Sequence, residues 1–304
     1  EITMTFRIAQ TRAKCRIRPM NRPLLSQASR PLTFEIDAVN ERGEILPTAI
    51  AGEHPLTLYV DKREIVTLMT LGAAPEALAI GWLRNQRLVR SLDEIAAVQV
   101  DWETDAVVVT TRAGMQDAER KLGSRTVTTG CGQGTVFGGL MDEIDQVRLP
   151  HDRHLRQSTL YALMDAVRHH ESIYKQAGAV HGCALARATP GGCEILMFFE
   201  DVGRHNAVDA IAGQMWLDAL DGADKIFYTT GRLTSEMVIK TAQMGIPFLV
   251  SRSGLTHMGW QIAQKIGLTM IGRAQGKHYL LFSGADRFER DCSAPTHEDE
   301  TTPR

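Results

Sequence analysis

Cys131 is the cysteine of this chain best suited to act as a nucleophile. It lies between Gly130 and Gly132, with Gly134 beyond, so no bulky neighbour shields its sulfur. A thiolate nucleophile needs exposure and a lowered pKa. A glycine-rich loop supplies the exposure; the alternative is an inert thiol in a flexible loop. Because Gly134 stands where a two-cysteine motif has its second thiol, we expect chemistry on a single cysteine.

Three segments that combine glycine with arginine each lie between a predicted strand and a predicted helix. They are residues 201–205 (DVGRH), 230–234 (TGRLT) and 251–255 (SRSGL). Parallel strands end at one edge of a sheet, where such loops collect ligand groups. Helix N-termini and arginine side chains both bind phosphate oxygens. Each loop alone would be an ordinary turn with a solvated arginine, but together they predict a polyanionic ligand such as a nucleotide with a diphosphate.

Asp201 and His205 could form an acid–base pair within the first of these loops. A loop carboxylate and imidazole beside an arginine more often hold the loop in shape. Structural support is therefore the first interpretation and catalysis the second. The loop residues expected to contact the anionic ligand are Gly203, Arg204, His205, Gly231, Arg232, Ser251 and Arg252.

Other ligand signatures are missing or incomplete. Neither the Gly-x-Gly-x-x-Gly dinucleotide pattern nor the P-loop pattern occurs, which excludes ordinary dinucleotide dehydrogenases and P-loop NTPases. The tripeptide His181-Gly182-Cys183 resembles the first half of a deaminase zinc site. However, a cysteine stands at the position of the acidic residue, and no Pro-Cys-x-x-Cys follows. Two histidine pairs remain, His151 with His154 and His169 with His170. Neither has a cysteine or carboxylate partner at ligand spacing, so no metal site is predicted.

The elements that must position these loops alternate between apolar runs and amphipathic stretches. This pattern is typical of a largely parallel sheet covered by helices. Strands are expected at 180–187, 194–199, 225–229, 248–251, 268–271 and 279–282, and helices at about 158–176, 206–220, 234–244 and 256–266.

The residues before this α/β region read as a small α+β domain. A half-buried strand at 32–39, two hairpins at 56–70 and 97–110, and a helix that begins at Pro75 make up this part. The chain then divides into a basic, disordered arm (1–30), the α+β domain (31–125), a connector with the Cys131 loop (126–157), the α/β domain (158–285) and a polar tail (286–304). A transit peptide or a partner-docking arm is the alternative for the first segment.

Composition sets the outer limits. The 304 residues carry a formal net charge of −2, which gives no general attraction to nucleic acid or to a membrane surface. No apolar run is long enough to span a bilayer. The five cysteines are scattered, with no CxxC pair and no secretory signal, so we expect reduced thiols and a cytoplasmic location.

Several segments, in their order along the chain, resemble the FdhD family of formate dehydrogenase accessory sulfurtransferases. The resemblance covers roughly residues 31–285, and its most specific part is the block EDVGRHNAVD at 200–209. The other matching segments are the Gly-Cys-Gly loop at Cys131, GAVH at 178–181, TGR at 230–232, Ser251-Arg252 and the closing strand pair at 272–282.

The resemblance implies a function and a set of partners. The C-terminal domain would have a cytidine-deaminase-like fold without zinc. The protein would carry sulfur as a persulfide on Cys131, from an L-cysteine desulfurase to the molybdenum bis(molybdopterin guanine dinucleotide) cofactor, which it binds as cargo for formate dehydrogenase. It would be a cytoplasmic homodimer. The segment that matches the cofactor-contacting residues of the family is Arg273, Ala274, Gln275, Gly276, Lys277 and His278.

The chain departs from the family pattern at Gly134, where a second cysteine is usual, and at Arg273 and Gln275. One thiol per step is enough for a persulfide relay, so the departure at Gly134 puts in doubt only a two-cysteine mechanism. Two alternatives remain open: a cofactor-binding chaperone that has lost sulfur transfer, and a deaminase-like nucleotide hydrolase.

Overall fold

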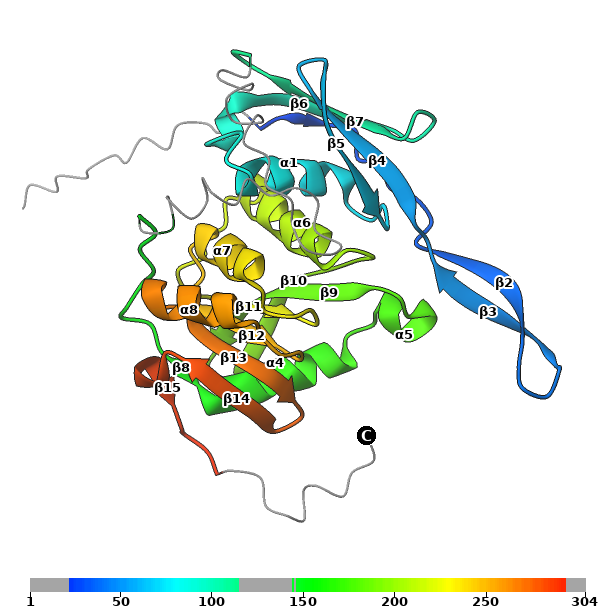
Figure 1. The fold of residues 1–304 in the computed structure, drawn as a ribbon. Helices are drawn as coiled ribbons and strands as arrows, with labels where there is room; N and C mark the ends of the chain where they lie inside the picture. The colour runs from blue at the N-terminus through cyan, green and yellow to red at the C-terminus, as the bar shows by residue number, and fades with distance from the viewer. Residues whose placement is uncertain (1–21, 115–143, 145, 294–304) are drawn as a thin grey trace, which may run out of the picture.

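The N-terminal unit is built on a five-stranded sheet with a helix across one face (Figure 1). The structure is a computed structural model, and it describes residues 22–114, 144 and 146–293. The strand order is β1-β6-β7-β4-β5. Leu56, Leu58 and Val60 alternate along one strand and are fully buried against helix α1, whose first residue, Pro75, suits the start of a helix. The elements are β1 (Leu24–Leu25), β4 (His54–Val60), β5 (Arg63–Thr70), α1 (Pro75–Asn85), the 3₁₀ turn Leu92–Glu94, β6 (Ile95–Asp101) and β7 (Ala106–Thr111).

A two-stranded ribbon, β2 (Thr33–Val39) and β3 (Ile45–Ala51), projects from this unit (Figure 1). The sequence predicted β2 and the turn after it but not β3. On one face of the ribbon, Phe34 lies opposite Ile50, and both side chains are exposed. The ribbon has an apolar face, yet it is not part of the core of the N-terminal unit.

The C-terminal unit contains a six-stranded sheet with the order β10-β9-β11-β12-β13-β14. Strands β10, β11, β12 and β13 run in one direction, and β9 and β14 run against them. The prediction of an α/β unit with a mostly parallel sheet is therefore confirmed; the antiparallel pairs come from two hairpins, at 189–192 and 275–278. The bounds are β9 (His181–Thr189), β10 (Gly192–Asp201), β11 (Lys225–Thr229), β12 (Phe248–Ser251), β13 (Thr269–Gln275) and β14 (His278–Ser283).

Helices cover both faces of this sheet. Three of them, α6 (Arg204–Leu217), α7 (Ser235–Gln243) and α8 (His257–Ile266), pack on one face, and α4 (Gln157–His169) packs on the other. The single helix predicted over 158–176 is wrong. It ends at His169, and a separate short helix, α5 (Ile173–Ala177), begins where Ser172 accepts a hydrogen bond from the Lys175 amide. No helix of the described segments is long and apolar enough to cross a membrane.

The two units meet through helices α1 and α6, which cross with their backbones in contact. A Cβ atom at Gly81 would overlap the carbonyl oxygen of Asp209, and one at Gly213 would overlap that of Ala77. Glycine is required at both positions because any side chain would push the helices apart. The crossing joins the two units at a fixed distance.

The predicted ends of the folded region need correction. The polar tail does not begin at 286, because β15 (Phe288–Glu289) pairs with β8 (Leu155–Arg156) and buries Phe288 in the core. The end of the basic arm is also folded: Ser26 donates a hydrogen bond to Glu76 of α1. Polar and charged residues dominate both segments, so the sequence favoured disorder there. The contacts that order them are made with residues distant in sequence, which local composition does not reveal.

Candidate functional site

The three predicted loops do meet at one edge of the six-stranded sheet, around His181. His181 begins β9, opposite Asp201 at the end of β10. Burial lowers the pKa of His181, and the positive charges of Arg204, Arg232 and Arg252 lower it further. The charges that act on this imidazole thus come from Arg232 and Arg252, which are exposed in two loops, and from Arg204, which begins helix α6 and is largely buried. Such a concentration of cations at a sheet edge suits a ligand with several anionic oxygens.

Hydrogen bonds between the loops fix this edge. Ser251 is fully buried, and its hydroxyl donates to the carbonyl oxygen of Gly231 at 2.6 Å. The Thr229 hydroxyl accepts from the Gly231 amide at 3.1 Å. Arg204 lies directly over Gly231, where a Cβ atom would come within 3.0 Å of Arg204 Cδ. Ser251 and Gly231 therefore position the arginines, and Ser251 does not offer its side chain to a ligand.

Asp201 occupies the junction between the two units. Its Oδ2 accepts from the Thr70 hydroxyl at 2.5 Å and from the Leu71 amide at 3.2 Å. Its Oδ1 accepts from the Gly203 amide at 3.0 Å and from Asn206 Nδ2 at 2.9 Å. Burial raises the pKa of Asp201, although these four hydrogen bonds act in the opposite direction. The geometry is that of a structural acceptor shared by both units, in line with the first interpretation of this residue.

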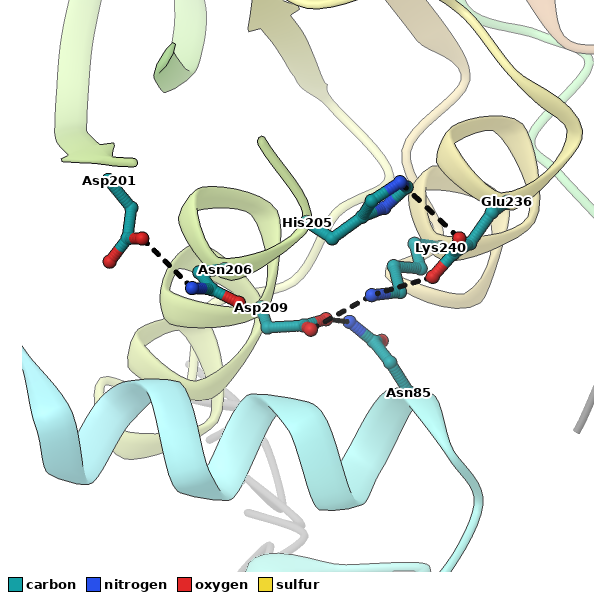
Figure 2. A network of polar contacts seen from close by, with 7 residues as sticks. All are labelled: Asn85, Asp201, His205, Asn206, Asp209, Glu236 and Lys240. Carbon is teal, nitrogen blue, oxygen red and sulfur yellow. Dashed lines mark hydrogen bonds and ion pairs between the residues drawn. The ribbon is translucent and has the colours of Figure 1, made fainter. Parts of the chain in front are cut away.

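His205 lies in the first turn of α6 and not in the loop where the sequence placed it. Its Nε2 is 3.3 Å from Glu236 Oε2, and Glu236 in turn contacts Lys240 (Figure 2). Burial, followed by the charge of Lys240, lowers the pKa of His205 to about 3, so the imidazole is neutral. Lys240 also pairs with Asp209, whose other oxygen accepts from Asn85 of α1. His205 thus ends a buried polar network that connects the arginine edge to the N-terminal unit.

The sequence missed Tyr174 as a residue of this site. Tyr174 lies in α5, which begins after the break that follows α4, and the Arg252 guanidinium lies over its ring, 5.4 Å from the centroid. The Glu200 carboxylate accepts from the amides of Ile173 and Tyr174 and so holds the start of α5. The available signal was the polar run at 169–172, which ends in Ser172, a suitable N-cap.

The predicted segment 273–278 forms the β13–β14 hairpin at the same edge. The Arg273 amide donates to the Ser253 carbonyl at 2.8 Å, which joins the hairpin to the loop after β12. Arg273, Gln275, Gly276, Lys277 and His278 are exposed. Ala274 is different, because its side chain is fully buried in the core and cannot contact a ligand. Cys131 and its glycine-rich loop lie outside the described residues.

Comparison with known proteins identifies the family. The model of the FdhD/NarQ family matches residues 51–289, most of the chain. The chain belongs to the FdhD/NarQ family. Relatives named "Sulfur carrier protein FdhD" include one from Listeria monocytogenes, 28% identical over 80% of this chain and 92% of the relative. Another, from Bacillus subtilis, is 26% identical over 81% of this chain and 94% of the relative.

A solved structure supports the fold. A formate dehydrogenase accessory protein from Desulfotalea psychrophila superposes with a TM-score of 0.67 at 24% identity, covering 85% of this chain and all of that one. The likeness extends over both units, so this arrangement of a β-rich unit and an α/β unit is shared between the two chains.

In this FdhD/NarQ chain the tripeptide His181-Gly182-Cys183 does not present its thiol as a zinc ligand. The thiol of Cys183 is fully buried, donates to Thr229 Oγ1 at 3.4 Å, and burial raises its pKa to about 12. No three histidine, cysteine or acidic side chains within the described ranges lie close enough to share a metal. A cavity of about 440 Å³, lined in part by His151, Leu268 and Arg287, lies at the opposite end of the sheet, and none of Arg204, Arg232 and Arg252 lines it.

Proposed function

We propose that this FdhD/NarQ chain is a sulfur carrier that serves formate dehydrogenase. It would accept sulfur from an L-cysteine desulfurase on Cys131 and deliver it to molybdenum bis(molybdopterin guanine dinucleotide). The observation that carries the proposal is that, in a chain of this family, the loops with Arg232 and Arg252 and the start of α6 with Arg204 meet at one end of the sheet, where Ser251 bonds to Gly231 and Arg204 lies against Gly231. The names of the relatives support the sulfur-carrying role.

The arginine edge would hold the anionic part of the cargo. Arginine binds phosphate oxygens in a bidentate manner, and the exposed guanidinium groups of Arg232 and Arg252 come from two different loops, with the largely buried Arg204 behind them at the start of α6. His181, kept neutral by its surroundings, can donate or accept a hydrogen bond there without adding charge. The hairpin at 273–278 borders the same edge and supplies Arg273 and Lys277 as further cations.

The chemical step needs one thiolate. Cys131 would attack the outer sulfur of the persulfide on the desulfurase; a new S–S bond forms on Cys131, and the desulfurase cysteine leaves as a thiolate. In the second step the outer sulfur passes to molybdenum as sulfide. Two electrons from the reduced metal break the S–S bond, and Cys131 returns to a thiolate. Gly134 cannot resolve the persulfide as a disulfide, which leaves it intact for delivery.

Labelling tests the sulfur transfer directly. The full chain is incubated with a cysteine desulfurase and ³⁴S-labelled cysteine, and the label is located by peptide mass spectrometry. We expect persulfide on Cys131, no label in Cys131→Ala, and normal labelling in the matched control Cys292→Ala, whose thiol is exposed. Equal labelling of wild type and Cys131→Ala would refute the proposal. Full activation of formate dehydrogenase by Cys131→Ser would favour a chaperone without sulfur transfer.

Anion binding is tested by calorimetry with pyrophosphate. Arg232→Ala removes one exposed cation of the edge, and we expect about tenfold weaker binding, the usual loss for a charge-assisted hydrogen bond. The control Arg187→Ala removes an arginine at the other end of β9, where it pairs with Glu194. Equal losses in the two variants would refute a specific anion site.

A further inference from the structure

We propose that Tyr174 and Arg252 form a stacking platform for the planar heterocycle of the ligand whose phosphates occupy the arginine edge. This inference rests on the proposed function, because it takes the ligand to be a guanine nucleotide. It adds a base-binding residue, Tyr174, to a site otherwise described by its charges.

The first observation is that the ring of Tyr174 is held in place but left open. Its amide and that of Ile173 donate to the Glu200 carboxylate at 3.1 and 2.5 Å, which ties the first turn of α5 to the end of β10. The Arg252 guanidinium lies over the ring at 5.4 Å. Tyr174 nevertheless remains 49% exposed. An aromatic ring fixed in this way can receive a planar group with little loss of conformational entropy.

The second observation is the place of this ring relative to the cations. Arg252 is also one of the three arginines whose charge acts on His181, so the ring and the arginine edge share a residue. A nucleotide with its diphosphate among the arginines has its base a short distance away. Stacking on an aromatic ring or on a guanidinium plane is the usual way that proteins hold a base without reading its edge.

The third observation is the backbone between Tyr174 and His181. Gly178 and Ala179 both have positive φ values, +64° and +57°. Alanine rarely adopts this conformation, so the turn is held by its surroundings. The turn reverses the chain from α5 into β9 and brings Tyr174 and His181 to the same edge. The platform therefore depends on the local fold and not on a chance surface ring.

The test compares a ligand that has a ring with one that lacks it. Binding of GDP and of pyrophosphate to the full chain is measured by calorimetry for wild type, Tyr174→Ala, Tyr174→Phe and Tyr174→Leu. We expect the ratio of GDP affinity to pyrophosphate affinity to fall about 5- to 150-fold in Tyr174→Ala and Tyr174→Leu, the usual range for a lost base stack. Tyr174→Phe should keep the ratio within about twofold of wild type. The control Tyr59→Ala, on β4, should not change it.

Each other outcome overturns the platform. If Tyr174→Ala weakens GDP and pyrophosphate equally, the ring only supports Arg252. If neither affinity changes, the ring has no role in binding. If wild type binds neither probe, the anion site fails together with the platform, while persulfide labelling of Cys131 still reports separately on sulfur transfer. Circular dichroism of each variant shows whether a loss of affinity comes from misfolding.

Discussion

Asp209 Oδ2 lies 2.8 Å from Lys240 Nζ, and the two side chains are 1% and 2% exposed. Burial alone would lower the pKa of Lys240, but the carboxylates of Asp209 and Glu236 raise it, so the ammonium stays charged. The pair connects α6 to α7, and Asn85 extends the contact to α1 (Figure 2). The EDVGRHNAVD block thus joins the two units, in addition to the ligand contacts proposed for it.

Removing one partner of this buried pair should be costly. We expect Lys240→Met to lower the free energy of unfolding by about 3–5 kcal/mol, because it leaves a buried carboxylate without its cation. The double variant Asp209→Asn/Lys240→Met should recover part of the loss. Urea denaturation measures both, with the exposed pair Arg187–Glu194 as a control, where Glu194→Gln should cost about 1 kcal/mol or less. A loss in Lys240→Met no larger than in the control would contradict this assignment.

The glycine crossing between α1 and α6 predicts a second stability effect. Gly81→Ala should lower the free energy of unfolding by about 3 kcal/mol or more, because the added methyl group overlaps backbone that cannot move away freely. Gly191→Ala is the matched control, since nothing lies near its Cβ position. Thermal denaturation followed by circular dichroism distinguishes them. Similar melting temperatures for the two variants would show that the units are not packed as described.

Asp201 allows a test between support and catalysis. Asp201→Ala leaves the donors of Thr70, Leu71, Gly203 and Asn206 without their acceptor, so we expect a loss of about 2–4 kcal/mol in unfolding free energy. Persulfide loading of Cys131 should persist at temperatures where the variant is folded. A variant of wild-type stability that no longer loads sulfur would instead indicate a chemical role.

The neutral state of His205 predicts a pH dependence. The ordinary pKa of histidine is about 6.5, and that of His205 in the folded chain is about 3. Below pH 6.5 the unfolded chain binds a proton that the folded chain does not, so stability falls as the pH drops. Arg204, Lys240, Glu236 and His181 all act on this imidazole.

The measurement isolates His205 by comparison with His205→Gln. Between pH 7.5 and pH 5, wild type should lose about 2 kcal/mol more unfolding free energy than the variant. Urea denaturation at the two pH values gives both numbers, and the other titrating groups largely cancel because they are common to the two chains. Parallel pH profiles would show that folding does not lower the pKa of His205.

The sequence by itself determined the elements whose signal is local. The strands at 225–229 and 248–251 have the predicted bounds, since short apolar runs between helices can only be buried strands in such a pattern. The alternation of strands and helices also predicted the common sheet edge, and with it the meeting of Arg204, Arg232 and Arg252. These inferences need only periodicity and the rule that parallel strands end at one edge.

The tertiary structure decided the roles of the polar residues. Asp201 accepts a hydrogen bond from Thr70, and Lys240 pairs with Asp209. A buried charge needs a polar partner, and the fold determines which group lies near enough to be that partner. The polar run that ends in Ser172 marks the break before α5, but the position of the new helix depends on Glu200, which lies on strand β10 and is distant in sequence. Spacing along the chain reports which face a side chain occupies, but only the packed structure shows which groups it meets there.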